Sequence, residues 1–415
     1  MTRKMKDSGV EWIGGIPESW ELVKIGQHFK QRNEKVSDLD FKPLSVTKNG
    51  IVPQLDNAAK SSNHNDRKLV KKGDFVINSR SDRKQSSGIA YEDGSVSLIN
   101  LVIKSRTVDT NFTNYLLKNA GFAEEFYRWG NGIVADLWST KWDSMKRIPI
   151  PLPELAEQKK VANVIRDKVK IIDTIISETQ QSINELKKYK QALITETVTK
   201  GLDKNVEMKD SGIEWIGEIP AKWEVKRIGN YYSQVKSKNL ELQETNLLSL
   251  SYGKIIRRSI NVTEGLLPNN FTGYNIVQPE DIVLRMTDLQ NDHVSLRTGL
   301  VQEKGIITSA YITIRKGIYS EIDSYYIHLF LYSFDVNKGF YGMGSGVRQG
   351  ITFNDIKKIQ VIVPPYDEQQ NIINYLRGKS SAIDNMIIEK KDLVTQLNAY
   401  KQSLIYEYVT GKKEA

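Results

Sequence analysis

The chain has 415 residues and a formal net charge of +9 at pH 7, and its length predicts two or three domains. Apolar and charged residues, 39% and 26% of the total, suit packed cores with a solvated surface. No apolar run reaches the ~18–20 residues of a membrane span, the N-terminus lacks the apolar stretch of a signal peptide, and there is no cysteine. We therefore expect a cytoplasmic protein that contacts no membrane and has no disulfide.

The first feature along the chain is a ten-residue motif that occurs twice. Met5–Gly14 returns as Met208–Gly217, at an offset of 203 residues. Later motifs return at an offset of 211 residues, namely Glu157-Gln158, Ile172-Asp173 and Tyr189-Lys190-Gln191 as Glu368-Gln369, Ile383-Asp384 and Tyr400-Lys401-Gln402. Solenoid repeats are about 20–50 residues long, so this period predicts a duplicated domain instead. Such a chain is expected to do one thing twice, on a target with two halves.

Each half begins with a predicted mixed α+β domain of about 150 residues. The short β-like runs are Asp74–Ile77, Ser97–Ile103, Asp281–Leu284 and Ala310–Ile314. Lys71–Asp74 and Gln278–Asp281 have the composition of tight turns that lead into a strand. Helical stretches are predicted at Tyr115–Trp129 and Ser324–Phe334.

Each half ends in a long predicted helix. The proline-containing segments at 149–153 and 363–365 cannot continue a helix interior, and about 45 residues without proline follow each of them. In both stretches, apolar residues recur at spacings of three and four, which is typical of a coiled-coil seam. The predicted seam residues are Ile165, Val169, Ile172, Ile176, Ile183, Leu186, Leu193, Leu376, Ile383, Ile387, Val394, Leu397 and Leu404.

Two equivalent seams in one chain favour antiparallel pairing about a pseudo-two-fold axis, and a helix of ~40 residues is about 60 Å long. Lys190 and Lys401 interrupt the seams at the same place, where we expect each stem to lie in the groove with its ammonium in water. The alternative is that each helix packs only on the core of its own domain. The predicted fold class is α+β, with mixed α/β domains at 1–153 and 202–365 and helices at 154–201 and 366–415.

No arrangement of residues predicts catalysis or a metal site. The four histidines are scattered and give no metal-ligand spacing, and there is no Walker A motif. Val363–Tyr366 is similar to the Asn/Asp-Pro-Pro-Tyr motif of adenine methyltransferases, but valine stands in place of the polar residue that binds the target amino group. This segment is therefore predicted to stop a helix, and the glycines of Gly342–Gly346 to form a sharp loop. We expect no catalytic residue, metal or cofactor in this chain.

Polar and basic side chains gather after equivalent strands of the two halves. In the first half the candidate DNA-binding residues are Lys48, Asn78, Arg80, Arg83, Lys84 and Gln85. In the second half they are Arg285, Asp288, Gln290, Asn291 and Arg297. Arg, Asn, Gln and Asp bind base edges, and Arg and Lys neutralise phosphates. A plain charged loop is the alternative for either segment alone, but unlike polar segments on a repeated frame are expected if each half recognises different bases.

A second candidate surface precedes each proline-containing segment. Its predicted residues are Arg128 and Lys141 in the first half, and Lys338, Arg348 and Gln349 in the second. Cationic groups beside aromatic residues and glycines suit a loop that faces a nucleic-acid groove. Trp142 and Phe353, which the 211-residue offset aligns, are predicted core anchors. The net positive charge agrees with a polyanion partner, although many basic proteins bind none.

Over essentially its whole length, the chain resembles the specificity subunit of type I restriction-modification systems. The motifs that carry the resemblance are the openings at Asp7–Gly14 and Asp210–Gly217, the Pro-x-x-x-Glu-Gln helix starts at Pro153 and Pro364, and the helix ends at 195–201 and 406–411. Because several motifs recur in order, twice, the match is specific.

The resemblance implies that each domain is a target recognition domain for one half of a bipartite, asymmetric site in double-stranded DNA. It implies that the helices set the gap and dock two adenine-methylating modification subunits, which use S-adenosylmethionine. Two restriction subunits, which use ATP and Mg²⁺, would join this core in defence against foreign DNA. The chain itself would catalyse nothing. A stand-alone DNA-modifying enzyme and a coiled-coil adaptor that binds no DNA remain the alternatives.

Overall fold

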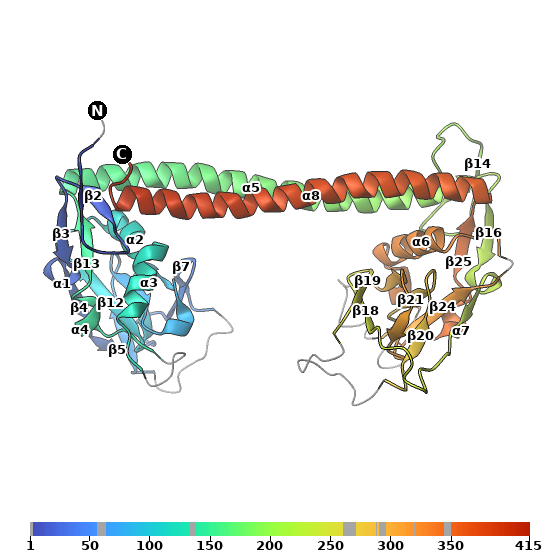
Figure 1. Ribbon diagram of the computed structural model, residues 1–415, viewed down its shortest axis with the longest axis horizontal. Coiled ribbons are helices and arrows are strands. Elements are labelled where there is room, and N and C mark those ends of the chain that lie inside the picture. Colours follow the sequence, from blue (N-terminus) through green and yellow to red (C-terminus); the bar gives the residue numbers. More distant parts are fainter. Residues whose placement is uncertain are drawn as a thin grey trace. The chain divides into compact units, whose positions relative to one another are not determined.

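The computed structural model describes residues 3–55, 64–132, 138–259, 271–287, 289, 296–318, 320–343 and 350–415. The chain divides into two compact units: unit 1 comprises Met1–Gln180 and Lys391–Ala415, and unit 2 comprises Gln181–Lys390. Each unit contains one mixed α/β domain and a segment of both long helices, α5 (Leu155–Lys200) and α8 (Tyr366–Val409) (Figure 1). In the ranges given above, no helix is long and apolar enough to cross a membrane.

The domain of unit 1 is built from small antiparallel sheets and short helices. Its four-stranded sheet has the order β10 (Ser87–Ile89), β9 (Phe75–Asn78), β12 (Asn100–Ser105), β4 (Phe29–Arg32). The other pairings are β1 (Met5–Asp7) with β2 (Gly15–Pro17), β3 (Glu21–Lys24) with β13 (Pro149–Leu152), β6 (Leu44–Thr47) with β7 (Gly50–Pro53), and β8 (Arg67–Val70) with both β5 (Lys35–Val36) and β11 (Gly94–Ser97). The helices are α1 (Ile25–His28), η1 (Ser81–Arg83), α2 (Thr110–Lys118), α3 (Ala120–Arg128) and α4 (Trp142–Met145).

Unit 2 repeats this plan. Its four-stranded sheet has the order β17 (Tyr232–Gln234), β24 (Ile312–Lys316), β21 (Ile282–Leu284), β22 (Thr298–Leu300). The other pairings are β14 (Met208–Asp210) with β15 (Glu218–Pro220), β16 (Glu224–Arg227) with β25 (Gln360–Val363), β18 (Leu248–Ser251) with β19 (Lys254–Arg257), and β20 (Asn275–Val277) with β23 (Gly305–Ile307). Its helices are η3 (Ile228–Asn230), α6 (Ser324–Val336), η4 (Gly339–Gly342) and α7 (Phe353–Ile356). The predicted α+β class with an internal repeat is confirmed.

The repeated Glu-Gln motif joins the start of each long helix to its domain. The amide of Gln158 donates to the carbonyl of the proline five residues earlier at 2.8 Å, and its oxygen accepts from the backbone N–H of Asp109, the N-cap of α2, at 2.8 Å. Gln369 makes the same two bonds in unit 2, both at 2.9 Å, the second with Asp323, the N-cap of α6. Both glutamine side chains are buried. The motif therefore belongs to the set of repeated backbone-holding contacts that the two units share, which we call the frame.

Each long helix ends against the core of the domain from which the other long helix starts. Gly411, at the end of α8, packs on Trp20 in unit 1, and Gly201, at the end of α5, packs on Trp223 in unit 2. Both glycines have positive φ, 71° and 79°, and a Cβ on Gly411 would lie 2.4 Å from Pro17. Glycine is therefore required at Gly411 both for its conformation and for the close approach.

The two long helices run antiparallel within each unit (Figure 1). Ile165, Ile172 and Leu404 belong to the main core of unit 1. Ile183, Ile383 and Ile387 form a cluster of their own in unit 2. The seam thus packs between helices, and near the domains it also joins the domain core. The predicted coiled-coil pairing is confirmed.

The lysines that interrupt the seam differ from the prediction. In unit 2 the Lys190 ammonium lies 2.7 Å from Asp384, and in unit 1 the Lys401 ammonium lies 2.6 Å from Asp173. The 211-residue offset exchanges one pair for the other. Each lysine is therefore held by an aspartate of the facing helix, because a partly buried ammonium gains more from a carboxylate than from water alone.

Two predicted elements are divided in the structure. The run Ser97–Ile103 contains a turn at 98–99, because β11 and β12 belong to different sheets. The helix predicted at Tyr115–Trp129 is interrupted at Asn119, whose side chain accepts from the N–H of Phe122 at 2.9 Å and so begins α3. Asparagine is a strong N-cap residue, and this signal was present in the sequence.

Candidate nucleic-acid interface

Two equivalent turns position the strands β9 and β21, after which the two predicted polar segments begin. As predicted, a tight turn precedes β9 and another precedes β21, and each closes with an aspartate N–H that donates to the carbonyl three residues earlier. The buried carboxylates of these residues bind arginines of the same sheets: Asp74 binds Arg32 of β4 at 2.6 Å, and Asp281 binds Arg315 of β24 at 2.7 Å. The hydrogen bond raises the pKa of each arginine. In both units a buried aspartate before the strand that carries the polar segment is thus held by an arginine of the same sheet, although the two arginines come from non-equivalent strands.

A buried tyrosine, Tyr127, holds the backbone of the polar segment of unit 1, which runs from Asn78 to Gln85. The Tyr127 hydroxyl donates to the carbonyl of Asn78 at 2.9 Å and to that of Arg83 at 3.2 Å. Burial raises the pKa of Tyr127 above the ordinary value of a tyrosine. The Asn78 side chain accepts from the N–H of Arg80 at 3.1 Å. These bonds fix the backbone while the side chains of Arg80 and Arg83 remain at the surface.

The cations of this segment pair with surface carboxylates. Asp82 lies 3.3 Å from Arg80 and 3.6 Å from Arg83, and Lys84 lies 2.8 Å from Glu124. The paired side chains are between 36% and 68% exposed. Exposed pairs contribute about 0–1 kcal/mol, so a phosphate can replace the carboxylates at small cost.

The two candidate surfaces of unit 1 form one surface. The N–H of Thr140 donates to the carbonyl of Ser79 at 3.0 Å, which brings the segment before the proline stop against the segment after β9. Arg80 and Lys141 consequently line a single cavity of about 550 Å³. Lys68 also lines it, donating to the carbonyl of Asn100, and burial lowers its pKa. A basic patch that combines two predicted segments was not evident from the sequence.

In unit 2 the same contact is present, although part of the predicted set lies outside the described residues. The N–H of Ile351 donates to the carbonyl of Met286 at 3.3 Å, the counterpart of the bond between Thr140 and Ser79. Arg285 follows β21 directly, as predicted. The predicted residues outside the described ranges are Asp288, Gln290, Asn291, Arg348 and Gln349.

Arg297 differs from the prediction, because its side chain is fully buried. Its guanidinium donates to the carbonyl of Thr287 at 2.7 Å and lies 5.6 Å from the ring centre of Tyr341. Its backbone N–H donates to Asp335 at 2.5 Å. An arginine inside the domain cannot contact a phosphate or a base edge, so Arg297 supports the fold and is removed from the candidate contacts.

The remaining predicted residues lie at the surface in several places. Arg128 bridges to Glu11 at 2.8 Å and so ties α3 to the opening motif. Lys48 is exposed in the turn of the β6–β7 hairpin, and Lys338 precedes η4 with a φ of 63°. Gln85 also has a positive φ, 65°, and follows the polar segment of unit 1. Trp142 and Phe353 begin α4 and α7 and pack on the margins of the cores, as predicted.

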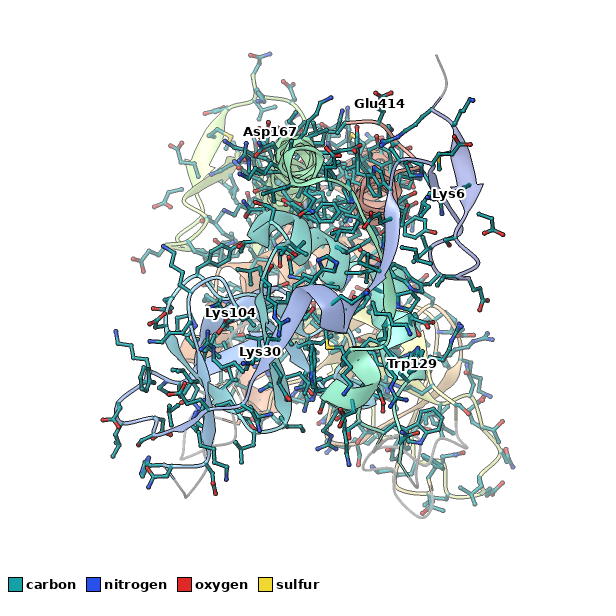
Figure 2. All side chains as sticks on the ribbon, turned by 90° about the vertical axis from the view of Figure 1, so that its left-hand side faces the viewer. Lys6, Lys30, Lys104, Trp129, Asp167 and Glu414 are labelled. Carbon is teal, nitrogen blue, oxygen red and sulfur yellow. The ribbon has the colours of Figure 1, made fainter. Side chains whose placement is uncertain are left out.

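One basic pair was missed by the sequence reasoning. Lys30 and Lys104 stand opposite each other on β4 and β12 and are both exposed (Figure 2). Like charges directly opposite in a sheet are destabilising, which favours an anion beside them. Their pairing depends on strand register, and no local sequence signal gives it.

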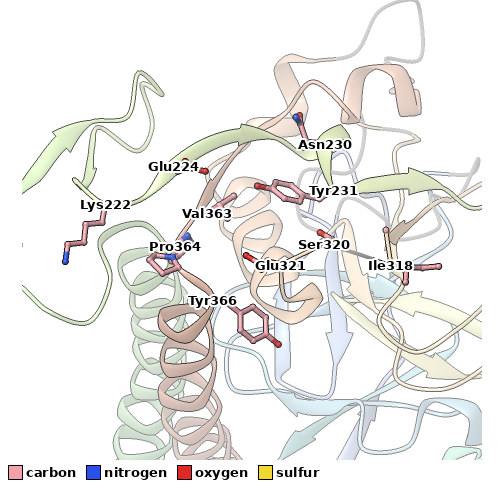
Figure 3. A pocket seen from close by; sticks show the side chains of 12 residues that line it. Lys222, Glu224, Asn230, Tyr231, Ile318, Ser320, Glu321, Val363, Pro364 and Tyr366 are labelled. Atoms are coloured by element: carbon pink, nitrogen blue, oxygen red, sulfur yellow. The ribbon is translucent and has the colours of Figure 1, made fainter.

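Among the residues that the structure describes, no metal site is found, and the proline motif has a structural role. Within the described residues there is no group of three or more His, Asp or Glu side chains that could hold an ion. A cavity of about 720 Å³ in unit 2 is bordered by Lys222, Glu224, Glu321 and the segment Val363–Tyr366 (Figure 3). The two prolines lie between the end of β25 at Val363 and the start of α8 at Tyr366, so this segment precedes a helix and does not stop one.

No protein-family model matches the chain. Among curated proteins, it is 24% identical to the provisionally named type I restriction enzyme MjaX specificity subunit of Methanocaldococcus jannaschii, with 96% of this chain and 95% of that protein covered. It is also 24% identical to the type I restriction enzyme MjaVIII specificity subunit of the same organism, with 96% and 93% covered.

Two solved structures share the fold. One, from a study of complex assembly and conformational transition of the type I R-M system, matches with a TM-score of 0.68 at 12% identity over 96% of this chain and 99% of that chain. The HsdS subunit from Thermoanaerobacter tengcongensis matches with a TM-score of 0.55 at 13% identity over 98% and 100%. The chain thus has the fold of a duplicated α+β protein with paired long helices. Its resemblance to the specificity subunits of type I restriction-modification systems is confirmed in sequence and in fold.

Proposed function

We propose that this chain is the non-catalytic DNA sequence-recognition subunit of a type I restriction-modification complex, in which each domain binds one half of a bipartite, asymmetric site. The observation that carries the proposal is a repeated frame around unlike polar segments. The turns at Asp74 and Asp281 and the bonds at Thr140 and Ile351 are equivalent. The segments that they hold differ in sequence after β9 and β21. Relatives that are named specificity subunits support the same function.

The proposed partners are double-stranded DNA, two modification subunits that use S-adenosylmethionine, and two restriction subunits that use ATP and Mg²⁺. We propose that α5 and α8 dock the modification subunits and set the length of the gap that neither domain recognises. A helix of 46 residues is roughly 70 Å long, which exceeds the ~34 Å of one turn of DNA.

The direct test is to express the chain with its modification subunit and map N6-methyladenine across the host genome. We expect methylation in a motif of two short parts separated by a constant gap. Replacing the surface side chains Arg80, Arg83 and Lys84 with methionine, glutamine and glutamine should change or abolish recognition of one part only. The matched control is Lys72→Gln, an exposed lysine of unit 1 away from this segment. Unchanged recognition of both parts in the triple variant would show that this segment does not contact the bases.

Two further measurements separate the proposal from its alternatives. Removing seven residues from each long helix should change the gap, and an unchanged gap would contradict the role of the helices. The purified chain alone, incubated with duplex DNA and S-adenosylmethionine or with Mg²⁺, should neither methylate nor cut it. Turnover without partners would favour a stand-alone enzyme, and a complex without salt-sensitive duplex binding would favour an adaptor.

A further inference from the structure

A polar cavity of about 500 Å³ lies within unit 1, where the domain meets the paired helices. The β6–β7 turn, helix α2 and the facing segments of α5 and α8 form its walls. Three lysines line it, Lys48, Lys118 and Lys401, with a single carboxylate, Asp173. The remaining polar lining consists mainly of amide side chains, those of Asn49, Gln85, Asn114, Asn119, Asn398 and Gln402. The amide N–H groups of Asn119 and Asn398 already donate to backbone carbonyls. The ammonium groups and the amide N–H groups of Asn114 and Gln402 can donate to a bound group, so this part of the cavity is suited to an anion.

The lysines outnumber the charge that could neutralise them. The only carboxylate of the lining, Asp173, is already bonded to Lys401 at 2.6 Å. In the described ranges, no ion pair is formed by Lys118, which is partly buried at the end of α2. Burial and the charge of Lys401 both lower the pKa of Lys118. A partly desolvated cation beside another cation is unfavourable without a counter-charge, and an anion in the cavity would supply it.

Unit 2 shows that the fold does not require a lysine at the position of Lys118. Counted from the N-caps of α2 and α6, Asn114 corresponds to His328, and Lys118 corresponds to Tyr332. The hydroxyl of Tyr332 is hydrogen-bonded to Gln191 of α5, and both His328 and Tyr332 are largely buried. The facing helices keep the equivalent ion pair, that of Lys190 with Asp384. The same frame therefore encloses aromatic side chains in unit 2 and a lysine-lined cavity in unit 1.

We propose that the cavity of unit 1 binds a phosphate group between Lys118 and Lys401, with the amides of Asn114 and Gln402 as further donors. A phosphate dianion at this place would pair with two ammonium groups and accept hydrogen bonds from the amides. The phosphate is either a free anion or a backbone phosphate of the nucleic acid. The second case rests on the proposed function, and the first does not.

The test uses the full chain and three variants. Lys118→Met removes the cation and keeps the stem, Lys118→Tyr copies unit 2, and Lys118→Arg keeps the charge. Lys72→Met, which removes an exposed lysine of the same unit, is the control for net charge. Calorimetric titration with inorganic phosphate at constant ionic strength should show binding to the wild type, to Lys118→Arg and to Lys72→Met. For Lys118→Met and Lys118→Tyr, we expect it to be at least tenfold weaker.

A second arm identifies the source of the phosphate. If it belongs to DNA, the complex with modification subunits should lose about one unit of the salt slope of duplex binding in Lys118→Met and none in Lys72→Met. The methylated sequence should stay the same, which separates this result from a failure of sequence recognition. Equal phosphate binding by all variants, or none by any, together with unchanged salt slopes would overturn the proposal. If no bipartite site is methylated at all, the proposed function fails, while the phosphate titration still decides the free-anion case.

Discussion

The two units share the frame, and they differ in the polar segments after β9 and β21 and in the side chains that face the long helices. Both have the buried aspartate before β9 or β21, the glutamine that joins the long helix to its domain, and a lysine–aspartate pair between helices. Where the domain faces the helices, unit 1 has Lys118 in a polar cavity. At the same position unit 2 has Tyr332, which is hydrogen-bonded to Gln191 of α5. The repeat thus preserves the contacts that hold the backbone and leaves the surfaces between them variable.

The difference shows which repeated residues belong to the frame. In the Glu-Gln motif the glutamine bonds a long helix to its domain. The aspartate of Ile-Asp and the lysine of Tyr-Lys-Gln bond one helix to the other, whereas the tyrosines are exposed. The polar segments after β9 and β21 do not recur. In unit 1 the side chains of Arg80 and Arg83 lie at the surface and pair with the exposed Asp82, so packing constrains them little. The comparison leads to three predictions, ordered from the largest expected effect to the smallest.

The largest effect concerns a histidine that only unit 2 buries. Burial lowers the pKa of His328 from 6.5 to about 4, so the folded state keeps it neutral. Its contribution to stability is present above pH 6.5 and is lost as the pH falls toward 4, because the unfolded chain binds the proton first. The loss should reach roughly 3 kcal/mol in unit 2.

His328→Asn, which copies Asn114 of unit 1, should remove this part of the pH dependence. Denaturant unfolding at pH 7, 5 and 4, followed by hydrogen exchange in peptides of α6, measures it. His28→Asn in unit 1 is the control. A pH dependence of unit 2 that is the same in the wild type and in His328→Asn would contradict the assignment.

The second effect separates two arginines that the sequence placed together. Arg297→Met should lower the free energy of unfolding of unit 2 by about 2 kcal/mol, because it removes charged hydrogen bonds from the interior. Arg80→Met should change the stability of unit 1 by less than about 0.5 kcal/mol and weaken duplex binding by the complex. Hydrogen exchange and a duplex titration measure the two quantities. Stability unaffected by Arg297→Met, with weaker duplex binding, would place Arg297 at the interface after all.

The smallest effect tests the equivalence of the two ion pairs between helices. Double-mutant cycles with Lys190→Met and Asp384→Asn, and with Lys401→Met and Asp173→Asn, should each give a coupling of about 0.2–1 kcal/mol. The two values should agree within roughly 0.5 kcal/mol in phosphate-free buffer. Hydrogen exchange in each unit provides the free energies. A clear coupling in one unit and none in the other would show that the repeat is not energetically symmetric.

Local patterns in the sequence predicted much of the frame. The duplicated motifs, the three-and-four spacing of the seam and the turns before β9 and β21 each depend on residues close together in the chain. The helix starts at Leu155 and Tyr366 followed from the prolines before them. The break at Asn119 also had a local signal, because asparagine is a common N-cap residue. The prediction nevertheless joined α2 and α3 into one helix.

The sequence alone determined that this protein is a duplicated α+β chain with two long helices, since periodicity and turn chemistry are short-range properties. Only the tertiary structure decided that Arg297 is buried, that Arg80 and Lys141 share one surface, and that the seam lysines bind aspartates of the facing helix. The physical reason is that burial, charge pairing and the joining of distant segments depend on which surfaces meet. The same residue type therefore supports the core in one unit and faces solvent in the other.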